Sequence, residues 1–250
     1  MTSPAAAAPE PLKTRERLIV ALDVPTVADA RRVVDELSEA ACAFKVGMQL
    51  FTAGGPMFVR ALTDAGHRVF LDLKFHDIPN TVANAGVAAA ELGVWMFNVH
   101  AAGGREMMTR TRETVTEHCA AAGIARPLII GVTVLTSSDE STLTETGVSA
   151  NVEDQVARLS MLTAASGLDG VVASPREVAV VRDAVGSKEF LTVTPGIRSK
   201  NATSDDQRRV TTIGEALAGG SDYVVVGRPI LGAKDRLDAL EQLVEEADRT

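Results

Sequence analysis

Apolar positions along the chain follow two alternating patterns. Short, mostly β-branched apolar runs recur, and each is followed by a longer stretch in which apolar residues repeat every three or four positions. The short runs are typical of strands that are buried on both faces, and the longer stretches are typical of amphipathic helices. The predicted strands are Leu18–Asp23, Ala43–Met48, Arg68–Lys74, Met96–Ala101, Leu128–Leu135, Gly170–Ser174, Leu191–Gly196 and Tyr223–Arg228.

Helices are expected between these strands and after the last one. The clearest are Val27–Glu39, Pro79–Leu92, Arg105–Ala122 and Lys234–Ala247. Eight strand-then-helix units without a linker imply a parallel sheet with right-handed crossovers. A chain of 250 residues can hold all eight units in one α/β domain, a (β/α)8 TIM barrel over residues 15–250. Residues 1–14, rich in Ala and Pro, are expected to form a disordered tail.

The main alternative fold is a doubly wound open sheet. Such a sheet would normally show a Gly-rich dinucleotide-binding turn after an early strand. Here Asp23-Val24-Pro25 follows the first strand instead, so the barrel is favoured.

Composition and charge narrow the class of protein. The formal net charge of −8 argues against nucleic acid or an anionic membrane as a partner, although it allows a local pocket for a small anion. No apolar run approaches the length of a membrane span, and the first residues do not resemble a signal peptide. Cys42 and Cys119 belong to no disulfide or zinc pattern. These features predict a cytoplasmic protein with free thiols.

Polar residues gather at the carboxyl ends of the predicted strands. In a barrel these ends meet at one mouth, where active sites are built. The residues concerned are Asp23, Lys45, Asp72, Lys74, His100, Thr136, Ser174, Pro195, Gly196, Gly227 and Arg228.

The third strand carries the most informative charges. Asp72 and Lys74 lie two apart, so they share one face of the strand, and Asp77 follows just before Pro79, where a helix could begin. A lysine between two aspartates is expected to stay protonated, which suits proton delivery to a carbanion better than Schiff-base formation. A purely structural network of ion pairs is the alternative for these charges.

The loops after the last two strands indicate a phosphate site. Gly196 and Gly227 would let backbone amides approach a phosphate, and Arg228 can offer a bidentate guanidinium. The polar stretch Ser199–Asp206 is either a lid over that phosphate or a solvated loop. Thr136-Ser137-Ser138 either donates to a polar ring or decorates a surface loop.

These residues resemble a known family. The segment Asp72–Thr81, Asp-Leu-Lys-Phe-His-Asp-Ile-Pro-Asn-Thr, is similar to the signature of orotidine 5′-phosphate decarboxylases in their common bacterial form. The other matching segments are Ala21–Asp23, Phe44–Gly47, Val132–Thr136, Thr194–Arg198 and Val226–Arg228. The matches cover the whole chain after the tail, and the D-x-K-x-x-D core is highly specific.

The resemblance implies roles for the charged residues. Lys74 would donate a proton to C6 of the pyrimidine after carbon dioxide leaves, and Asp72 would lie against the substrate carboxylate. Lys45 would bridge between that carboxylate and the ribose, while Asp23 would bind a ribose hydroxyl. The substrate would be orotidine 5′-monophosphate and the product uridine 5′-monophosphate, which completes the de novo pyrimidine route. No metal or other cofactor is implied.

The resemblance also implies binding residues and a partner. Thr136 would help to read the pyrimidine, and Arg198 would lie at the lid. The remaining residues expected to bind substrate, mainly through its phosphate, are Pro195, Gln207, Gly227 and Arg228. Asp77 and Thr81 would reach into the site of a neighbouring subunit, which makes a homodimer the expected functional unit.

Three other functions stay open at this stage. A related barrel group shares D-x-K-x-x-D but uses magnesium in sugar-phosphate decarboxylases and synthases, with an acidic ligand at the position that Lys45 holds here. A Schiff-base aldolase and a catalytically silent phosphosugar-binding barrel are the other two.

Overall fold

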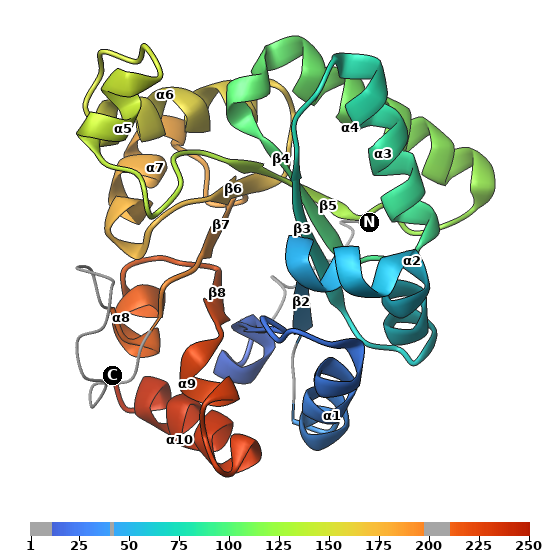
Figure 1. The fold of residues 1–250 in the computed structure, drawn as a ribbon. Helices are drawn as coiled ribbons and strands as arrows, with labels where there is room; N and C mark the ends of the chain where they lie inside the picture. Colours follow the sequence, from blue (N-terminus) through green and yellow to red (C-terminus); the bar gives the residue numbers. More distant parts are fainter. Residues whose placement is uncertain (1–11, 41–42, 198–210) are drawn as a thin grey trace, which may run out of the picture.

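Eight parallel strands close into one barrel, and each strand pairs with its neighbours in the sequence (Figure 1). This computed structural model describes residues 12–40, 43–197 and 211–250. The strands are β1 Leu18–Ala21, β2 Ala43–Gly47, β3 Val69–Phe75, β4 Met96–His100, β5 Leu128–Val132, β6 Gly170–Val172, β7 Leu191–Thr194 and β8 Tyr223–Val226. The pairing of β1 with both β2 and β8 confirms the predicted barrel and excludes an open sheet.

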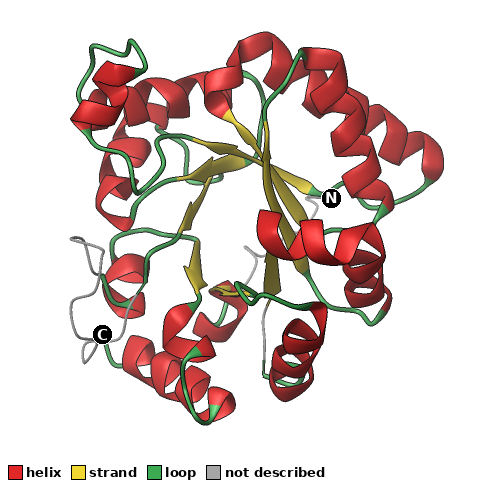
Figure 2. Cartoon of the chain, viewed as in Figure 1, coloured by secondary structure: helices red, strands yellow, loops and turns green. Residues whose placement is uncertain are grey.

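Helices surround the barrel on its outer side (Figure 2). The α-helices are α1 Val27–Leu37, α2 Met48–Asp64, α3 Pro79–Glu91, α4 Gly104–Ala122, α5 Glu140–Glu145, α6 Val152–Ala165, α7 Val178–Val185, α8 Ile213–Ala218, α9 Arg228–Leu231 and α10 Arg236–Asp248. Short 3-10 helices are η1 Thr14–Arg17, η2 Ala101–Gly103 and η3 Pro175–Glu177.

Local sequence explains where several helices begin. The side chains of Thr26, Asn151 and Asp235 accept backbone N–H groups at the starts of α1, α6 and α10, as N-cap residues do. Helix α3 begins with Pro79, as the sequence predicted, because proline lacks the N–H that the first helical position leaves unused.

The apolar core has two layers, one inside the barrel and one between the strands and the helices. Alternation along each strand produces both, since successive side chains point to opposite faces. Residues that fill the barrel interior include Ile19, Ala21, Ala43, Phe70, Met96, Ile130, Val193 and Val225. Their neighbours along the strands, such as Val20, Phe44, Leu71 and Phe97, pack against the helices.

Several strands end earlier than their sequence predicted. Strand β5 stops at Val132 rather than Leu135, and β8 stops at Val226, so that Arg228 begins α9. Strands β6 and β7 likewise end two residues early. The polar and glycine residues included in the predicted ranges leave the sheet and turn over the mouth, which is why the boundaries were wrong there.

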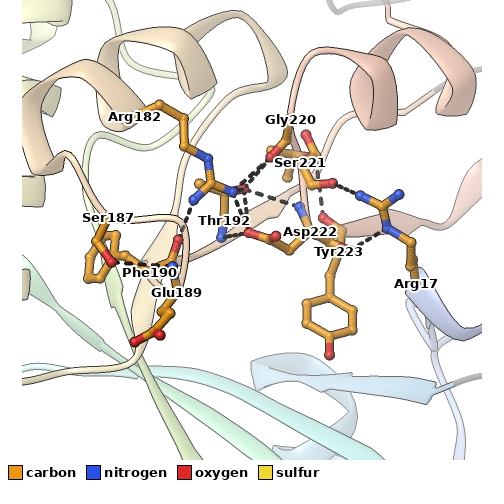
Figure 3. Close-up of polar contacts among 11 residues, drawn as sticks. Arg17, Arg182, Ser187, Glu189, Phe190, Thr192, Gly220, Ser221, Asp222 and Tyr223 are labelled. Carbon is orange, nitrogen blue, oxygen red and sulfur yellow. Dashed lines mark hydrogen bonds and ion pairs between the residues drawn. The ribbon is translucent and has the colours of Figure 1, made fainter. Parts of the chain in front are cut away.

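The amino-terminal ends of β7 and β8 are joined by a network of polar contacts (Figure 3). The Arg182 guanidinium donates to the Phe190 and Gly220 carbonyls at 2.5 and 2.8 Å, and its Nη2 lies 2.6 Å from Asp222 Oδ2. Arg17 donates to the Asp222 carbonyl at 3.0 Å. These contacts give the backbone carbonyl groups hydrogen-bond donors at the base of the barrel, opposite the mouth.

The expected amino-terminal tail is described only from Leu12 onward. Thr14, at the end of that expected tail, begins η1, and its hydroxyl lies 2.5 Å from Asp248 Oδ1 of α10. Residues 1–11 lie outside the described residues, so their disorder stays a prediction.

Candidate active site

A cavity of about 270 Å³ opens at the carboxyl ends of the strands, where the sequence predicted a site. Its polar lining residues are Asp23, Lys45, Asp72, Lys74, Thr136 and Arg228, with Pro195, Gly196 and Gly227 beside them. Phe70, Val132, Val134, Leu135, Val172, Ile197 and Val225 supply apolar walls. An apolar cavity with a few convergent charges is the usual form of a small-molecule site.

Four of the predicted charged residues form a continuous array along one side of this cavity. Lys45 Nζ lies 3.0 Å from Asp23 Oδ1 and 3.3 Å from Asp72 Oδ2. Lys74 Nζ lies 2.6 Å from Asp72 Oδ1. Charges therefore alternate in sign from Asp23 to Lys74, across the ends of β1, β2 and β3.

The centre of the array is buried and its end at Asp23 is open. The side chains of Lys45 and Asp72 are 11 % and 13 % exposed, whereas that of Asp23 is 59 % exposed. Burial alone would lower the pKa of Lys45, but the carboxylates of Asp72 and Asp23 outweigh it and raise that pKa. Burial would raise the pKa of Asp72, but Lys45 and Lys74 outweigh it and lower that pKa. Both residues are ionised at neutral pH.

A distortion of β3 brings Lys74 to the cavity. Leu71 pairs with Phe97 and Phe75 pairs with Val99, so β3 uses four residues where β4 uses two. Lys74 has φ +53°, the only positive value for a non-glycine residue among those that the structure describes. Backbone strain of this kind is concentrated at functional sites.

Asn98 of β4 is the polar residue that the sequence analysis missed. It is 1 % exposed, and its amide contacts both Asp72 and the backbone of Lys74 at 2.8 Å. An asparagine at a barrel-facing position within the apolar run Met96–Ala101 was the available signal, because buried amides need partners.

Two histidines lie close behind Lys74. The rings of His76 and His100 are 5.5 Å apart. Burial, followed by the nearby His76 and Lys74, lowers the pKa of His100, so this imidazole is neutral at pH 7. Neither histidine lines the cavity.

The turns after β7 and β8 face the cavity from the side opposite β3. Gly196 has φ +89°, a conformation that strongly favours glycine. A Cβ atom on Gly227 would lie 3.7 Å from Asp23 Oδ2, so this turn closely approaches the open end of the charge array. Arg198, Gln207 and the segment Ser199–Asp206 lie outside the described residues, and their expected roles stay predictions.

Asp77 and Thr81 do not line the cavity of their own chain. Both residues are exposed, and Asp77 Oδ1 accepts the N–H of Ile78 at 2.7 Å. A second cavity, of about 220 Å³, lies on the other side of the array and is lined by Asp23, Lys45, Asp72, Lys74, Gly47, Met48 and Gln49.

Within residues 12–40, 43–197 and 211–250, no group of three His, Cys, Asp or Glu side chains could hold a metal ion. In the array itself, the ammonium of Lys45 lies between the carboxylates of Asp23 and Asp72. A cation bound by those two carboxylates would meet this positive charge.

Comparisons with known proteins agree with the geometry. A protein 54 % identical over 235 residues, covering 94 % of this chain and 96 % of its own, is an orotidine 5′-phosphate decarboxylase of Syntrophotalea carbinolica. Another, from Moorella thermoacetica, is 50 % identical over 238 residues and covers 95 % of this chain and 94 % of its own.

A solved structure and a family model extend the comparison to the fold. Orotidine 5′-phosphate decarboxylase from Lactobacillus acidophilus superposes with a TM-score of 0.81 at 37 % identity, over 92 % of this chain and 98 % of that one. The model of the "Orotidine 5'-phosphate decarboxylase / HUMPS family" matches residues 16–243. The chain therefore belongs to the orotidine 5′-phosphate decarboxylase / HUMPS family.

Proposed function

We propose that this protein decarboxylates orotidine 5′-monophosphate to uridine 5′-monophosphate and carbon dioxide, in pyrimidine biosynthesis and without a cofactor. The observation that carries the proposal is the array Asp23–Lys45–Asp72–Lys74, which shares one cavity with Gly227 and Arg228. Relatives at about half identity that bear this name support the same reaction.

In this proposal Lys74 and Asp72 act on the reacting carbon. The bond between C6 and the carboxylate breaks, carbon dioxide leaves, and the electron pair stays on C6. The ammonium of Lys74 stabilises that developing charge and then transfers a proton to C6. Asp72 lies against the substrate carboxylate, where its negative charge disfavours the bound substrate relative to the neutral departing product.

Magnitudes explain why an array is needed rather than one lysine. Enzymes that catalyse reactions that are very slow in water lower the activation free energy by roughly 20 kcal/mol. One unit-charge contact at ~4 Å contributes about 4 kcal/mol at an effective dielectric of about 20. The remaining stabilisation must come from preorganisation of the whole array and from binding energy at the remote phosphate.

The rest of the substrate would bind on both sides of that reaction centre. Asp23 and Lys45 would contact the ribose, and Thr136 would donate to the pyrimidine. Gly227 and Arg228 would hold the phosphate, together with Pro195 beside them. Arg198 and Gln207 are proposed for the same phosphate from the sequence resemblance alone.

The magnesium-dependent alternative of the same barrel group has no support. Lys45 stands where that chemistry needs an acidic ligand, and it pairs with both neighbouring carboxylates. Turnover of orotidine 5′-monophosphate in the presence of EDTA is therefore expected to be unchanged. Abolition of that turnover by EDTA, with recovery on adding magnesium, would favour the alternative.

The working enzyme is proposed to be a homodimer in which Asp77 and Thr81 complete the partner's site. Both residues are exposed and lie outside their own cavity, while the second cavity beside Lys45 and Lys74 offers a place for groups from elsewhere. Exposed apolar side chains at Met48 and Ile78 lie at the same end of the barrel and suit an interface.

Mixing two inactive variants tests this sharing. A Lys74→Ala subunit paired with an Asp77→Ala subunit regains one intact site per heterodimer. Random exchange makes half of the dimers mixed, so about a quarter of wild-type activity should return. Absence of recovered activity, with mixed dimers demonstrated by mass spectrometry, would argue against a shared site.

A cytoplasmic location and the absence of nucleic-acid or membrane partners are also proposed. The net charge of −8 and the buried free thiol of Cys119 support this location. In the described part of the chain, no helix has the length and apolar character needed to cross a membrane.

The direct test of the reaction follows the absorbance of orotidine 5′-monophosphate with purified, metal-stripped protein. We expect conversion to uridine 5′-monophosphate, identified by chromatography, with one carbon dioxide released per product. Substrate that stays unchanged while the protein is folded and dimeric would overturn the assignment.

A further inference from the structure

Asn98 occupies a position inside the barrel that is normally apolar. Its neighbours on β4, Phe97 and Val99, pack toward the helices, so the side chain of Asn98 faces the barrel interior. The residue is 1 % exposed. A buried amide without hydrogen-bond partners is strongly unfavourable, so the contacts of Asn98 need explanation.

Both halves of the Asn98 amide are used. Its Oδ1 accepts the backbone N–H of Lys74 at 2.8 Å, and its Nδ2 donates to Asp72 Oδ1 at 2.8 Å. The orientation is fixed by chemistry, since a backbone N–H can only donate and an ionised carboxylate can only accept. A flipped amide would face like groups at both contacts.

These two bonds hold the distorted part of β3. The pairs Leu71–Phe97 and Phe75–Val99 leave Asn98 alone opposite the three residues from Asp72 to Lys74. Lys74 adopts φ +53°, which is unfavourable for a lysine. The bond from Asn98 satisfies the N–H that this distortion removes from the sheet.

The same amide fixes the carboxylate of Asp72. One oxygen, Oδ1, accepts from both Lys74 Nζ and Asn98 Nδ2, while Oδ2 faces Lys45. Rotation of the carboxylate would break at least one of these contacts. Asn98 itself is not among the residues that line the cavity.

We propose that Asn98 is a positioning residue for the decarboxylation, which sets the Asp72 carboxylate and the Lys74 backbone in their reactive places without touching the substrate. This inference rests on the proposed roles of Asp72 and Lys74. It assigns the function of the bulge in β3 to a single side chain on the neighbouring strand.

Three substitutions test the two bonds of Asn98. Asn98→Leu removes both and keeps a side chain that branches at the same carbon. Asn98→Asp keeps an acceptor for the Lys74 N–H but places a second carboxylate against Asp72. Asn98→Ser restores a small group that can donate and accept. Thr111→Val on α4 is the matched control, because Thr111 is fully buried and its hydroxyl donates to the Met107 carbonyl of its own helix.

The expected result is a loss in kcat with little change in KM. Misplacement of reacting groups by about 1 Å costs about 100-fold in rate, so kcat should fall about 100-fold in Asn98→Leu and less in Asn98→Ser. KM and inhibition by uridine 5′-monophosphate should change less than about threefold, since the phosphate turns lie on other strands. Thr111→Val should match wild type.

A pH profile distinguishes positioning from general stability. Burial raises the pKa of Asp72, and Lys45 and Lys74 lower it. The hydrogen bond from Asn98 lowers the pKa of Asp72 further, as a smaller contribution. Other charged or titratable groups around this carboxylate are Asp23, which follows β1, and His100, at the end of β4. The acid limb of kcat should therefore move to higher pH in Asn98→Leu and Asn98→Ser but not in Thr111→Val.

Wild type and Lys74→Ala are measured beside these variants. If wild type does not turn over the substrate, the proposed function fails and the inference fails with it. If wild type is active and Lys74→Ala is inactive, while folded Asn98→Leu keeps kcat within threefold and an unmoved acid limb, only the inference about Asn98 is overturned. Should Asn98→Leu not fold, the same two readouts on Asn98→Ser decide.

Discussion

The two ends of the barrel both concentrate charge, but they use it in opposite ways. At the base, the Arg182 guanidinium contacts two backbone carbonyls, the Thr192 hydroxyl and the Asp222 carboxylate (Figure 3). At the mouth, the ammonium groups of Lys45 and Lys74 contact carboxylates and border the cavity. The base ties strands together, whereas the mouth presents charges to a ligand.

This difference shows how ion pairs that look alike can be told apart. A guanidinium whose donors are taken up by backbone carbonyls has a structural role, because each lost contact leaves a strand end unsatisfied. An alternating array of side chains that faces a cavity can offer its charges to a substrate. Loss of charge at the mouth should therefore affect rate, and loss at the base should affect stability.

The largest effect is expected for Lys74→Ala. Removal of the proposed proton donor and of one positive charge at C6 should lower kcat by at least about 10⁴-fold. The melting temperature should stay close to that of wild type, because the Lys74 side chain is partly exposed and Asp72 keeps its contacts with Lys45 and Asn98. Steady-state turnover assays and thermal unfolding scans on the same preparation measure kcat and the melting temperature.

Arg228→Ala should give the next largest effect on function. Loss of a charge-assisted phosphate contact is expected to raise KM by about 100-fold, with a smaller fall in kcat. The control is added free guanidinium, which should recover part of the activity of Arg228→Ala and none of the activity of Lys74→Ala. An unchanged KM would place the phosphate elsewhere on the mouth.

Arg182→Met is the corresponding change at the base. It should lower the free energy of unfolding by about 2 kcal/mol, because Asp222 and the carbonyls of Phe190 and Gly220 lose the donors that Arg182 supplies. At a temperature where the variant is folded, kcat and KM should stay within about twofold of wild type. A large loss of kcat in the folded variant would mean that the base takes part in function.

The smallest expected effect is the pH dependence of the stability that Asp72 and Lys45 contribute. The pKa of Asp72 is lowered, so its contribution to stability is present above the ordinary carboxyl range and is lost as pH falls through its folded-state pKa. The pKa of Lys45 is raised, so its contribution is present below the ordinary lysine range and is lost as pH rises through its folded-state pKa.

The charge of this pair should therefore be constant from about pH 5 to about pH 9. The melting temperatures of wild type and Asp72→Asn are measured at a series of pH values. The difference between them should be constant across that window and should become smaller in acid. A difference that changes steeply near pH 7 would show that another group, such as His100, titrates with the array.

Much of the barrel is readable in the sequence, because strands buried on both faces appear as apolar runs and all eight were located. Their carboxyl ends were less accurate. Val132 ends β5, yet the residues that follow it, Thr133, Val134 and Leu135, also have side chains typical of strands. Where the chain leaves the sheet is decided by tertiary contacts at the mouth, which periodicity does not record.

The site was predicted in part for a related reason. Asp72, Lys74 and Lys45 were expected together because parallel strands end at one mouth, and they are found within hydrogen-bonding distance. Asn98 was missed, since only the bulge at Lys74 makes an amide useful there, and a bulge has no signature in alternation. Asp77 and Thr81 are exposed and do not line the cavity of their own chain, so their expected role in a partner's site stays a prediction.

The most direct measurement compares substrate turnover in Lys74→Ala and Arg182→Met, both purified in EDTA and assayed below the melting temperature of the less stable one. The account predicts that Lys74→Ala is folded and at least about 10⁴-fold slower, while Arg182→Met is less stable and turns over orotidine 5′-monophosphate at nearly the wild-type rate. Equal turnover by folded Lys74→Ala and wild type would contradict it.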